Sequence, residues 1–215
     1  MVSTRIEPTV DNIRQALALP DFDARSAWLK MAPMPRPLER PPEMAGVVRL
    51  AGVLLLLYPH AGGLTFSLTR RTDTLAHHKG QVSLPGGGRE NEETLAQTAL
   101  RETCEEIHVC LDESCLLGAL TPLYLIVSDF EISPFVGYAA ARPTFEPDPV
   151  EVAEMVEMPL ALLIDDTVKA TERWTFRGTE MDVPFYHVKG HKIWGATAAI
   201  LSEFEWRLRT VLNNL

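Results

Sequence analysis

The stretch LPGGGRENEETLAQTALRETCEEIHV, residues 84–109, constrains this chain most, because three glycines run directly into a dense acidic pattern. On a helical wheel at about 100° per residue, the less polar residues of 93–107 share one arc, which predicts an amphipathic helix with a buried stripe. The stripe consists of Ala96, Leu100, Thr103, Cys104 and Ile107. The opposite side of the helix is left to acidic residues.

The carboxylates of Glu102, Glu105 and Glu106 are predicted to lie together on that opposite side. Like charges three or four residues apart cost an isolated helix about 0.2–0.5 kcal/mol per pair, so something should offset their repulsion. Hard divalent cations such as Mg²⁺ take oxygen ligands, and one helix face supplies them without rearranging a loop. The alternative is a solvated surface face, since Glu is a good helix former.

The neighbouring glycines favour a site over a plain surface face. Glycine lets the backbone adopt φ > 0 and approach an anion or a metal, and a helix opened by Asn91, Glu92 or Glu93 favours negative charge at its N-terminus. Arg101 follows Glu93 by about two helical turns, so a charged hydrogen bond between them would lock the corner between loop and helix. These features together predict a phosphate-and-metal site.

Outside this segment, β-rich apolar runs predict a sheet flanked by few helices, so the chain reads as an α/β protein. Strands are expected at 47–58, 64–71, 116–127, 132–140, 170–178 and 181–190. Helices are expected at 9–19, 93–107 and 193–212.

Residues 1–45 are expected to form an N-terminal arm and residues 46–215 the main domain. Thr9 or Asp11 can cap the first helix, which has apolar residues at helical spacing. The segment MAPMPRPLERPP at 31–42 has five prolines, which suits an extended linker and not a helix or central strand. The apolar stripes of the arm and of the last helix allow a homodimer, although ordinary core packing also explains them.

Composition excludes several classes of partner. The formal net charge is -9, so attraction to a nucleic-acid backbone is not favoured. The longest apolar run, 50–58, is about half of what a membrane helix needs, and no signal peptide is recognisable, so a cytoplasmic protein without a membrane span is expected. Cys104, Cys110 and Cys115 are odd in number and lack a CxxC spacing, which predicts buried thiols and argues against a disulfide framework or a zinc site.

The acidic segment resembles the Nudix box, G-x5-E-x7-R-E-U-x-E-E-x-G-U with U an aliphatic residue. The matching positions are Gly87, Glu93, Arg101, Glu102, Glu105, Glu106 and Val109. Two positions depart: Thr103 replaces an aliphatic residue, and His108 replaces the glycine that ends the helix. Because His tolerates φ > 0 better than most non-glycine residues, a strained but similar left-handed corner is expected at His108.

The resemblance implies a Nudix-like α/β/α sandwich with a central mixed β-sheet, and hydrolysis of a nucleoside diphosphate linked to another group. It assigns Mg²⁺ or Mn²⁺ to Glu102, Glu105, Glu106 and the Gly87 carbonyl, and a structural pair to Arg101 and Glu93. Bridging metals would neutralise the diphosphate and lower the pKa of an attacking water.

Upstream, LTRRTDTLAHHKGQVSLPGG at 68–87 resembles the additional signature of the coenzyme A pyrophosphatase branch, with Ala76 where that branch has Arg and Leu84 where it has Phe. The resemblance implies cleavage of coenzyme A or acyl-CoA into adenosine 3′,5′-bisphosphate and a 4′-phosphopantetheine compound. The candidate phosphate-binding residues are Arg70, Arg71, His77, His78 and Lys79. Since neighbours on a strand alternate in direction, at most one of the two arginines faces a cleft, and Arg71 is preferred.

The segments 147–160 and 193–201 also resemble this branch, so the resemblance covers about residues 47–212. Glu151 is the favoured carboxylate outside the box for meeting the metals or taking a proton, with Glu154 as a second candidate. One alternative keeps the box but changes the substrate to ADP-ribose or another nucleoside diphosphate derivative, which Ala76 favours. Another alternative is a non-catalytic nucleotide-binding module, which would normally show a damaged carboxylate set.

Overall fold

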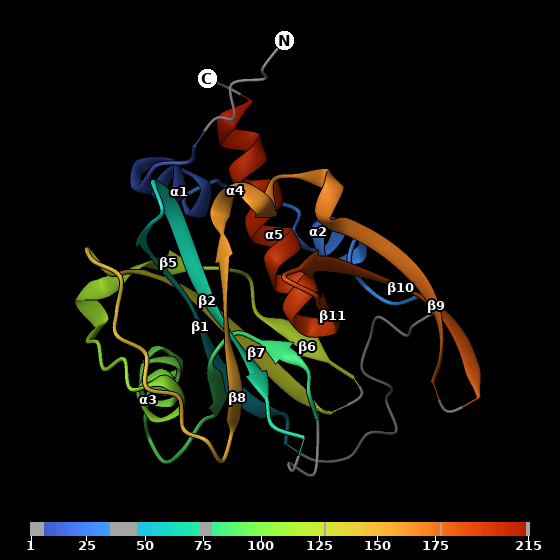
Figure 1. Cartoon of the computed structure of the whole chain (residues 1–215), viewed down its shortest axis with the longest axis horizontal. Coiled ribbons are helices and arrows are strands. Elements are labelled where there is room, and N and C mark those ends of the chain that lie inside the picture. Colours follow the sequence, from blue (N-terminus) through green and yellow to red (C-terminus); the bar gives the residue numbers. More distant parts are fainter. Residues whose placement is uncertain (1–6, 35–46, 74–78, 127, 177, 214–215) are drawn as a thin grey trace.

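A computed structural model describes residues 7–34, 47–73, 79–126, 128–176 and 178–213 (Figure 1). The helices are α1 (Val10–Leu17), α2 (Ala24–Leu29), α3 (Leu95–Ile107), α4 (Leu160–Leu163) and α5 (Gly195–Leu212). The strands are β1 (Arg49–His60), β2 (Gly63–Arg71), β3 (Val82–Ser83), β4 (Gly86–Gly88), β5 (Leu116–Ala119), β6 (Leu123–Leu125), β7 (Phe130–Tyr138), β8 (Val152–Pro159), β9 (Lys169–Phe176), β10 (Thr179–Val188) and β11 (His191–Trp194).

The larger sheet runs β3-β2-β1-β7-β5, with β4 beside β1, β6 beside β7 and β8 beside β2. It is mixed, because β1 and β7 are parallel while the other pairs are antiparallel. Strands β9, β10 and β11 form a second, antiparallel sheet.

The alternation of apolar residues along β1 gives the sheet two buried faces. Leu54, Leu56 and Tyr58 pack with α3 residues, whereas Leu55 and Leu57 belong to the core that includes α5. In Figure 1, α3 lies on one side of the sheet, and α5 lies on the other with α1 and α2. The predicted α/β sandwich with a mixed central sheet is confirmed.

The N-terminal residues pack onto α5. Thr9 caps α1 through a capping box with Asn12, and α1 buries Ile13 and Ala16. Helix α2, which the sequence pattern did not predict, is capped by Asp23. Most of the proline-rich segment 31–42 lies outside the described residues. Both apolar stripes are therefore used within the chain, and a homodimer stays a prediction.

Two expected strands are divided differently in the structure. The run 116–127 gives β5 and β6 instead of one strand, and both pair with β7. The helix expected at 193–212 begins at Gly195, because residues up to Trp194 pair with β10. None of the helices among the described residues has the length and apolar character needed to cross a membrane.

Candidate functional site

Helix α3 and the turns at its two ends frame the predicted site. Thr94 caps the helix through a capping box with Gln97, so α3 begins at Leu95 and not at the expected residues 91–93. Asn91, with φ 49°, lies in the preceding turn. At the other end, His108 has φ 54° and ψ 32°, and its N–H donates to the Cys104 carbonyl at 3.0 Å. The left-handed corner predicted at His108 is confirmed.

The buried face of α3 is rotated from the expected stripe. Its buried residues are Thr98, Ala99, Leu100, Thr103, Glu106 and Ile107, whereas Ala96 and Cys104 are only partly buried. The reason lies in β1, where a Cβ at Gly52 would overlap the backbone of Leu95 and Ala99, so the helix packs directly over this glycine. The prediction that Glu106 lies on the open side with Glu102 and Glu105 is therefore wrong.

The predicted contact between Arg101 and Glu93 is present. The arginine Nε donates to Glu93 Oε2 at 3.1 Å and its Nη2 donates to Oε1 at 3.0 Å. Glu93 also accepts from the Thr98 hydroxyl at 2.9 Å and from the Glu90 amide at 2.9 Å. The Arg101 hydrogen bonds are the main reason that the pKa of Glu93 falls to about 2. Glu93 is thus a fully bonded anion that fixes the corner before α3.

Arg101 also offsets part of the repulsion among the helix carboxylates. Its Nη1 lies 2.9 Å from both Glu102 Oε1 and Glu105 Oε2, and its Nη2 donates to the Gly88 carbonyl at 3.1 Å. Glu105 is 60% exposed, so its ion pair is screened by solvent. Partial burial raises the pKa of Glu102, and Arg101 opposes that rise. The Arg101 guanidinium thus offsets negative charge of Glu102 and Glu105 on the open side of α3, and its ion pairs do not include Glu106.

Glu106 is the most perturbed carboxylate of this group. Its side chain is 4% exposed, and Oε2 is buried without a hydrogen-bond partner. Burial raises its pKa to about 8, Arg71 lowers it, and the charges of Glu151 and Glu102 raise it further. A buried carboxyl with an open oxygen is costly unless another group meets it, and such groups are typical of functional sites.

Arg71, the last residue of β2, and Glu151, directly before β8, complete the cluster. Arg71 Nη1 lies 3.7 Å from Glu106 Oε1, and its Nη2 lies 3.7 Å from Glu151 Oε2. Arg70 lies elsewhere, near Asp73 at 3.6 Å and Glu154 at 3.5 Å. The two arginines therefore meet different carboxylates, and of the two only Arg71 pairs with Glu106.

Of the candidate phosphate-binding residues other than the two arginines, the structure describes only Lys79, which is exposed. His77 and His78, together with Ala76, lie outside the described residues. Glu154, the second candidate base, pairs with Arg70 and with His191 Nε2 at 3.2 Å, away from α3. Glu151 is thus the candidate that Arg71 links to Glu106.

Thr72 helps to position Glu151, although the sequence analysis assigned it no role in the site. Its amide donates to the Glu151 carbonyl at 2.9 Å and its hydroxyl donates to the Val150 carbonyl at 2.9 Å. At the other end of the same loop, the Asp148 amide donates to the Glu106 carbonyl at 2.8 Å. Glu151 is therefore held between the ends of β2 and α3.

The expectation of buried thiols is wrong for two of the three cysteines. Cys104 and Cys110 form a disulfide, with Cα atoms 4.4 Å apart, and Cys115 is a free, partly buried thiol. The left-handed turn at His108 brings the chain back beside the last turn of α3, within the Cα separation that a disulfide requires. Spacing alone did not reveal the pair, because it depends on this turn.

The cluster fits a divalent cation in its chemistry. Within the described ranges, no three His, Cys, Asp or Glu side chains lie close enough to hold a metal ion as they stand. Glu106 Oε2 is nevertheless a buried oxygen without a partner, and a Cβ at Gly87 would overlap the Glu102 carboxylate. Oxygen donors of this kind are what Mg²⁺ and Mn²⁺ take.

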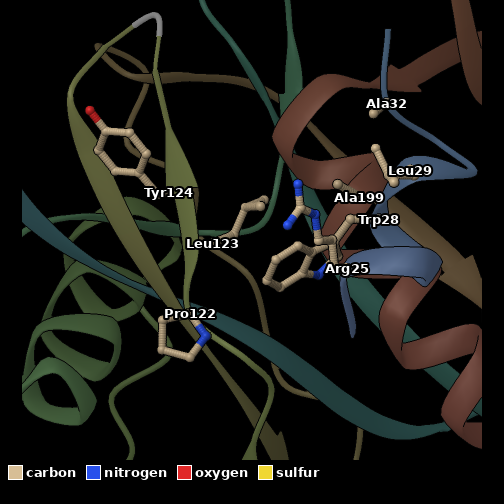
Figure 2. Close-up of a pocket in the computed structure, with 8 residues that line it drawn as sticks. All are labelled: Arg25, Trp28, Leu29, Ala32, Pro122, Leu123, Tyr124 and Ala199. Carbon is tan, nitrogen blue, oxygen red and sulfur yellow. The ribbon is translucent and has the colours of Figure 1, made fainter. Parts of the chain in front are cut away.

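A cavity of about 260 Å³ lies between α2, α5 and β6, away from these carboxylates (Figure 2). Arg25, Trp28 and Tyr124 are among its lining residues, and none of the predicted site residues lines it. Leu123 of β6, which lines the cavity, is paired with Ile132 of β7. Ile132 is paired with Ala51 of β1, and Ala51 is paired with Gly88 of β4. Three strand spacings, or about 14 Å, thus separate the cavity from the glycine strand β4.

Comparison with known proteins agrees with the motif. The NUDIX domain family matches residues 48–177. A protein described as "Uncharacterized Nudix hydrolase NudL" from Pectobacterium atrosepticum is 36% identical over 194 residues, covering 87% of this chain and 93% of that protein. "Nudix hydrolase 15, mitochondrial" from Arabidopsis thaliana is 32% identical, covering 77% of this chain and 60% of that protein.

Among solved structures, a MutT/nudix family protein from Enterococcus faecalis shares the fold, with a TM-score of 0.53 at 14% identity, covering 96% of this chain and 80% of that one. The family match spans more than half of the chain and includes β4, α3 and β7. The chain therefore belongs to the Nudix hydrolase family, as an enzyme that hydrolyses phosphoanhydride bonds.

Proposed function

We propose that this enzyme hydrolyses the diphosphate bond of coenzyme A or an acyl-CoA, releasing adenosine 3′,5′-bisphosphate and the corresponding 4′-phosphopantetheine, with Mg²⁺ or Mn²⁺ as cofactor. The observation that carries the proposal is the position of Arg71. This residue belongs to the upstream segment that resembles the coenzyme A branch, and it lies 3.7 Å from carboxylates of both Glu106 and Glu151.

Glu102, Glu105, Glu106 and the Gly87 carbonyl would hold the cation. When bound, it would neutralise charge on the diphosphate and lower the pKa of an attacking water. Arg101 and Glu93 would keep α3 and the glycine strand in place through their paired hydrogen bonds. The buried, unpartnered Oε2 of Glu106 supports its assignment as the ligand least able to remain without a cation.

Arg71 supplies a permanent positive charge beside the cluster. Its side chain is 26% exposed and its two ion-pair distances exceed hydrogen-bond length, so it has donors left for a phosphate oxygen. Glu151 is 46% exposed and can accept a proton at Oε2. Coenzyme A has a ribose 3′-phosphate besides its diphosphate, so it offers basic side chains more to bind than ADP-ribose does.

The test is a substrate panel of coenzyme A, acetyl-CoA, dephospho-CoA and ADP-ribose, each with Mg²⁺ and with Mn²⁺, with products separated by chromatography. We expect kcat/KM for coenzyme A to exceed that for ADP-ribose by about 10-fold or more, equivalent to about 1.4 kcal/mol of discrimination. Dephospho-CoA should fall in between if the 3′-phosphate is recognised. Equal turnover of ADP-ribose and coenzyme A would reject the substrate assignment.

Arg71→Gln and Arg70→Gln are matched variants on one strand. Removing the Arg71 guanidinium should lower kcat/KM for coenzyme A by about 10- to 100-fold, because a charged hydrogen bond contributes about 1.5–3 kcal/mol. Arg70→Gln should have a smaller effect, since Arg70 pairs with Asp73 and Glu154 instead. If the Arg70 variant is the more damaged of the two, the placement of substrate beside Arg71 is wrong.

A further inference from the structure

The Cys104–Cys110 disulfide closes the end of the helix that carries the site. Cys104 directly precedes Glu105 and Glu106, and Cys110 follows the last residue of the Nudix box. The closed segment contains His108, whose left-handed backbone is unfavourable for any residue with a Cβ. The disulfide therefore restrains a corner that glycine would otherwise form without strain.

This corner also holds the loop that carries Glu151. The Glu146 amide donates to the Ile107 carbonyl at 3.2 Å, and His108 Nδ1 lies 2.8 Å from the Glu146 carbonyl. The Asp148 amide donates to the Glu106 carbonyl at 2.8 Å, and the Glu151 amide donates to the Asp148 carbonyl at 3.2 Å. A displacement of segment 104–110 would thus move both Glu106 and Glu151.

The two cysteines differ in their exposure to solvent. Cys110 is exposed, whereas Cys104, in the last turn of α3, is partly buried. A small thiol can therefore reach Cys110 Sγ first. Access of this kind separates labile disulfides from those sealed in a core.

We propose that Cys104–Cys110 is a reversible redox site that sets the geometry of the metal-binding carboxylates. A low-molecular-weight thiol attacks Cys110 Sγ, the S–S bond breaks, and Cys104 leaves as a thiolate that takes a proton. A second small thiol attacks the mixed disulfide, which releases the small-molecule disulfide and the Cys110 thiol. The protein pair gains two electrons and two protons, and two small thiols are oxidised.

Reduction frees the corner at His108, and the loop that bears Glu151 loses a fixed support. The oxidised protein, in which the disulfide is formed, then has the better-defined metal site. The inference does not depend on which diphosphate is hydrolysed, because it concerns the ligands of the cation and not the substrate.

The first measurement is a thiol count with alkylation and peptide mass analysis, on the full chain kept with a small-molecule disulfide and on the same protein after reduction with dithiothreitol. In the oxidised sample, only Cys115 should be alkylated once the chain is denatured. In the reduced sample, all three cysteines should be alkylated. Alkylation of Cys104 and Cys110 before reduction would overturn the proposal.

The second measurement is calorimetric binding of Mn²⁺ alone to both samples. Residues that position metal ligands typically change affinity by about 10-fold or more when disturbed, so the reduced protein should bind Mn²⁺ about 10-fold more weakly. Cys110→Ser should bind like the reduced protein in either redox state. Cys115→Ser, the matched control, should keep the full redox response.

Identical Mn²⁺ affinity in the oxidised and reduced wild type would overturn the proposal even if the disulfide exists. That comparison uses one unmodified chain, so it stands if Cys110→Ser fails to fold. Failure of coenzyme A to be hydrolysed would leave both measurements intact, which separates this inference from the substrate assignment.

Discussion

Helices α3 and α5 both place glutamates on faces that pack against other parts of the chain, but the two helices differ in how fully the buried carboxylates are hydrogen-bonded. In α5, Glu203 and Glu205 are fully buried and both oxygens of each are bonded. In α3, Glu106 is buried with Oε2 left without a partner. The difference distinguishes a structural network from a functional site, because a buried polar group without a partner is typical of a position where another group binds.

Both carboxylate oxygens of Glu203 accept hydrogen bonds within the α5 network. Its Oε1 accepts from the Thr121 amide and hydroxyl and from Arg207 Nε, at 2.8–3.1 Å, and its Oε2 accepts from the Trp28 indole at 2.9 Å. Glu205 is bonded in the same manner by Lys169, Arg209 and Tyr186. These hydrogen bonds and ion pairs link α2, the segment just before β6 and the second sheet to α5.

Glu106→Gln should produce the largest effect, on catalysis. Loss of this proposed metal ligand should lower kcat by roughly 10³-fold. The thermal midpoint of the metal-free protein should not fall, because burial keeps Glu106 protonated below about pH 8 and the amide then replaces a neutral acid. Steady-state kinetics and thermal unfolding of the metal-free protein measure the two quantities. Glu92→Gln, an exposed control on the turn before α3, should stay within about twofold of wild type. An unchanged rate for Glu106→Gln would reject the metal assignment.

Glu203→Ala should produce the opposite pattern. Removing this carboxylate leaves Arg207 buried and unpaired, so the free energy of unfolding should fall by about 3–5 kcal/mol. The kcat of the molecules that remain folded should stay within about twofold, since Glu203 touches no predicted site residue. Urea unfolding and activity at low temperature measure both. A loss below about 1 kcal/mol would mean that the α5 network is not a scaffold.

The contrast between the two helices also shows where sequence reasoning succeeds. Sequence spacing predicted the contact of Arg101 with Glu93, and the resemblance to the Nudix box predicted the left-handed corner at His108. Both features depend on residues close in sequence. Periodicity likewise predicted α1, α3 and the strands β1, β2 and β7. Local pattern is enough where local geometry decides the outcome.

Burial and long-range pairing were not predictable in this way. The burial of Glu106 depends on Gly52 in β1, which lets α3 pack directly over that position. A helical wheel of α3 does not include Gly52, so it could not predict this burial. The bonding of Glu203 and Glu205 requires partners on α2, β9 and β10, so the helical spacing of α5 alone did not reveal it. The Cys104–Cys110 disulfide required the turn between its two cysteines.

The stability of the metal-free protein should depend on pH through Glu106. Its folded pKa of about 8 lies above the ordinary 4.5, so between these values the native state binds a proton that the unfolded chain has lost. The free energy of unfolding should therefore fall as pH rises from 5 to 7.5, by about 3 kcal/mol from this group. The raised pKa of Glu102 acts in the same direction. The lowered pKa of Glu93 acts only between about pH 2 and 4.5.

Urea unfolding in the presence of EDTA across this range measures the slope, and Glu106→Gln is the control that should flatten it. Saturating Mn²⁺ should also flatten the slope, because a bound cation holds the carboxylate ionised in the native state. A wild-type stability that rises from pH 5 to 7.5 would contradict the assignment of Glu106 as a buried acid without a partner.

The smallest expected effect concerns how the two helices begin. Thr94 gives α3 a capping box, whereas the first turn of α5 has no side-chain cap and relies on burial against the sheet. Thr94→Ala should therefore lower the free energy of unfolding by about 1 kcal/mol, measured by urea unfolding. Thr210→Ala on the exposed side of α5 should change it by less than about 0.5 kcal/mol. Equal effects would mean that α3, like α5, is positioned by packing alone, and that the corner held by Glu93 and Arg101 does not need its cap.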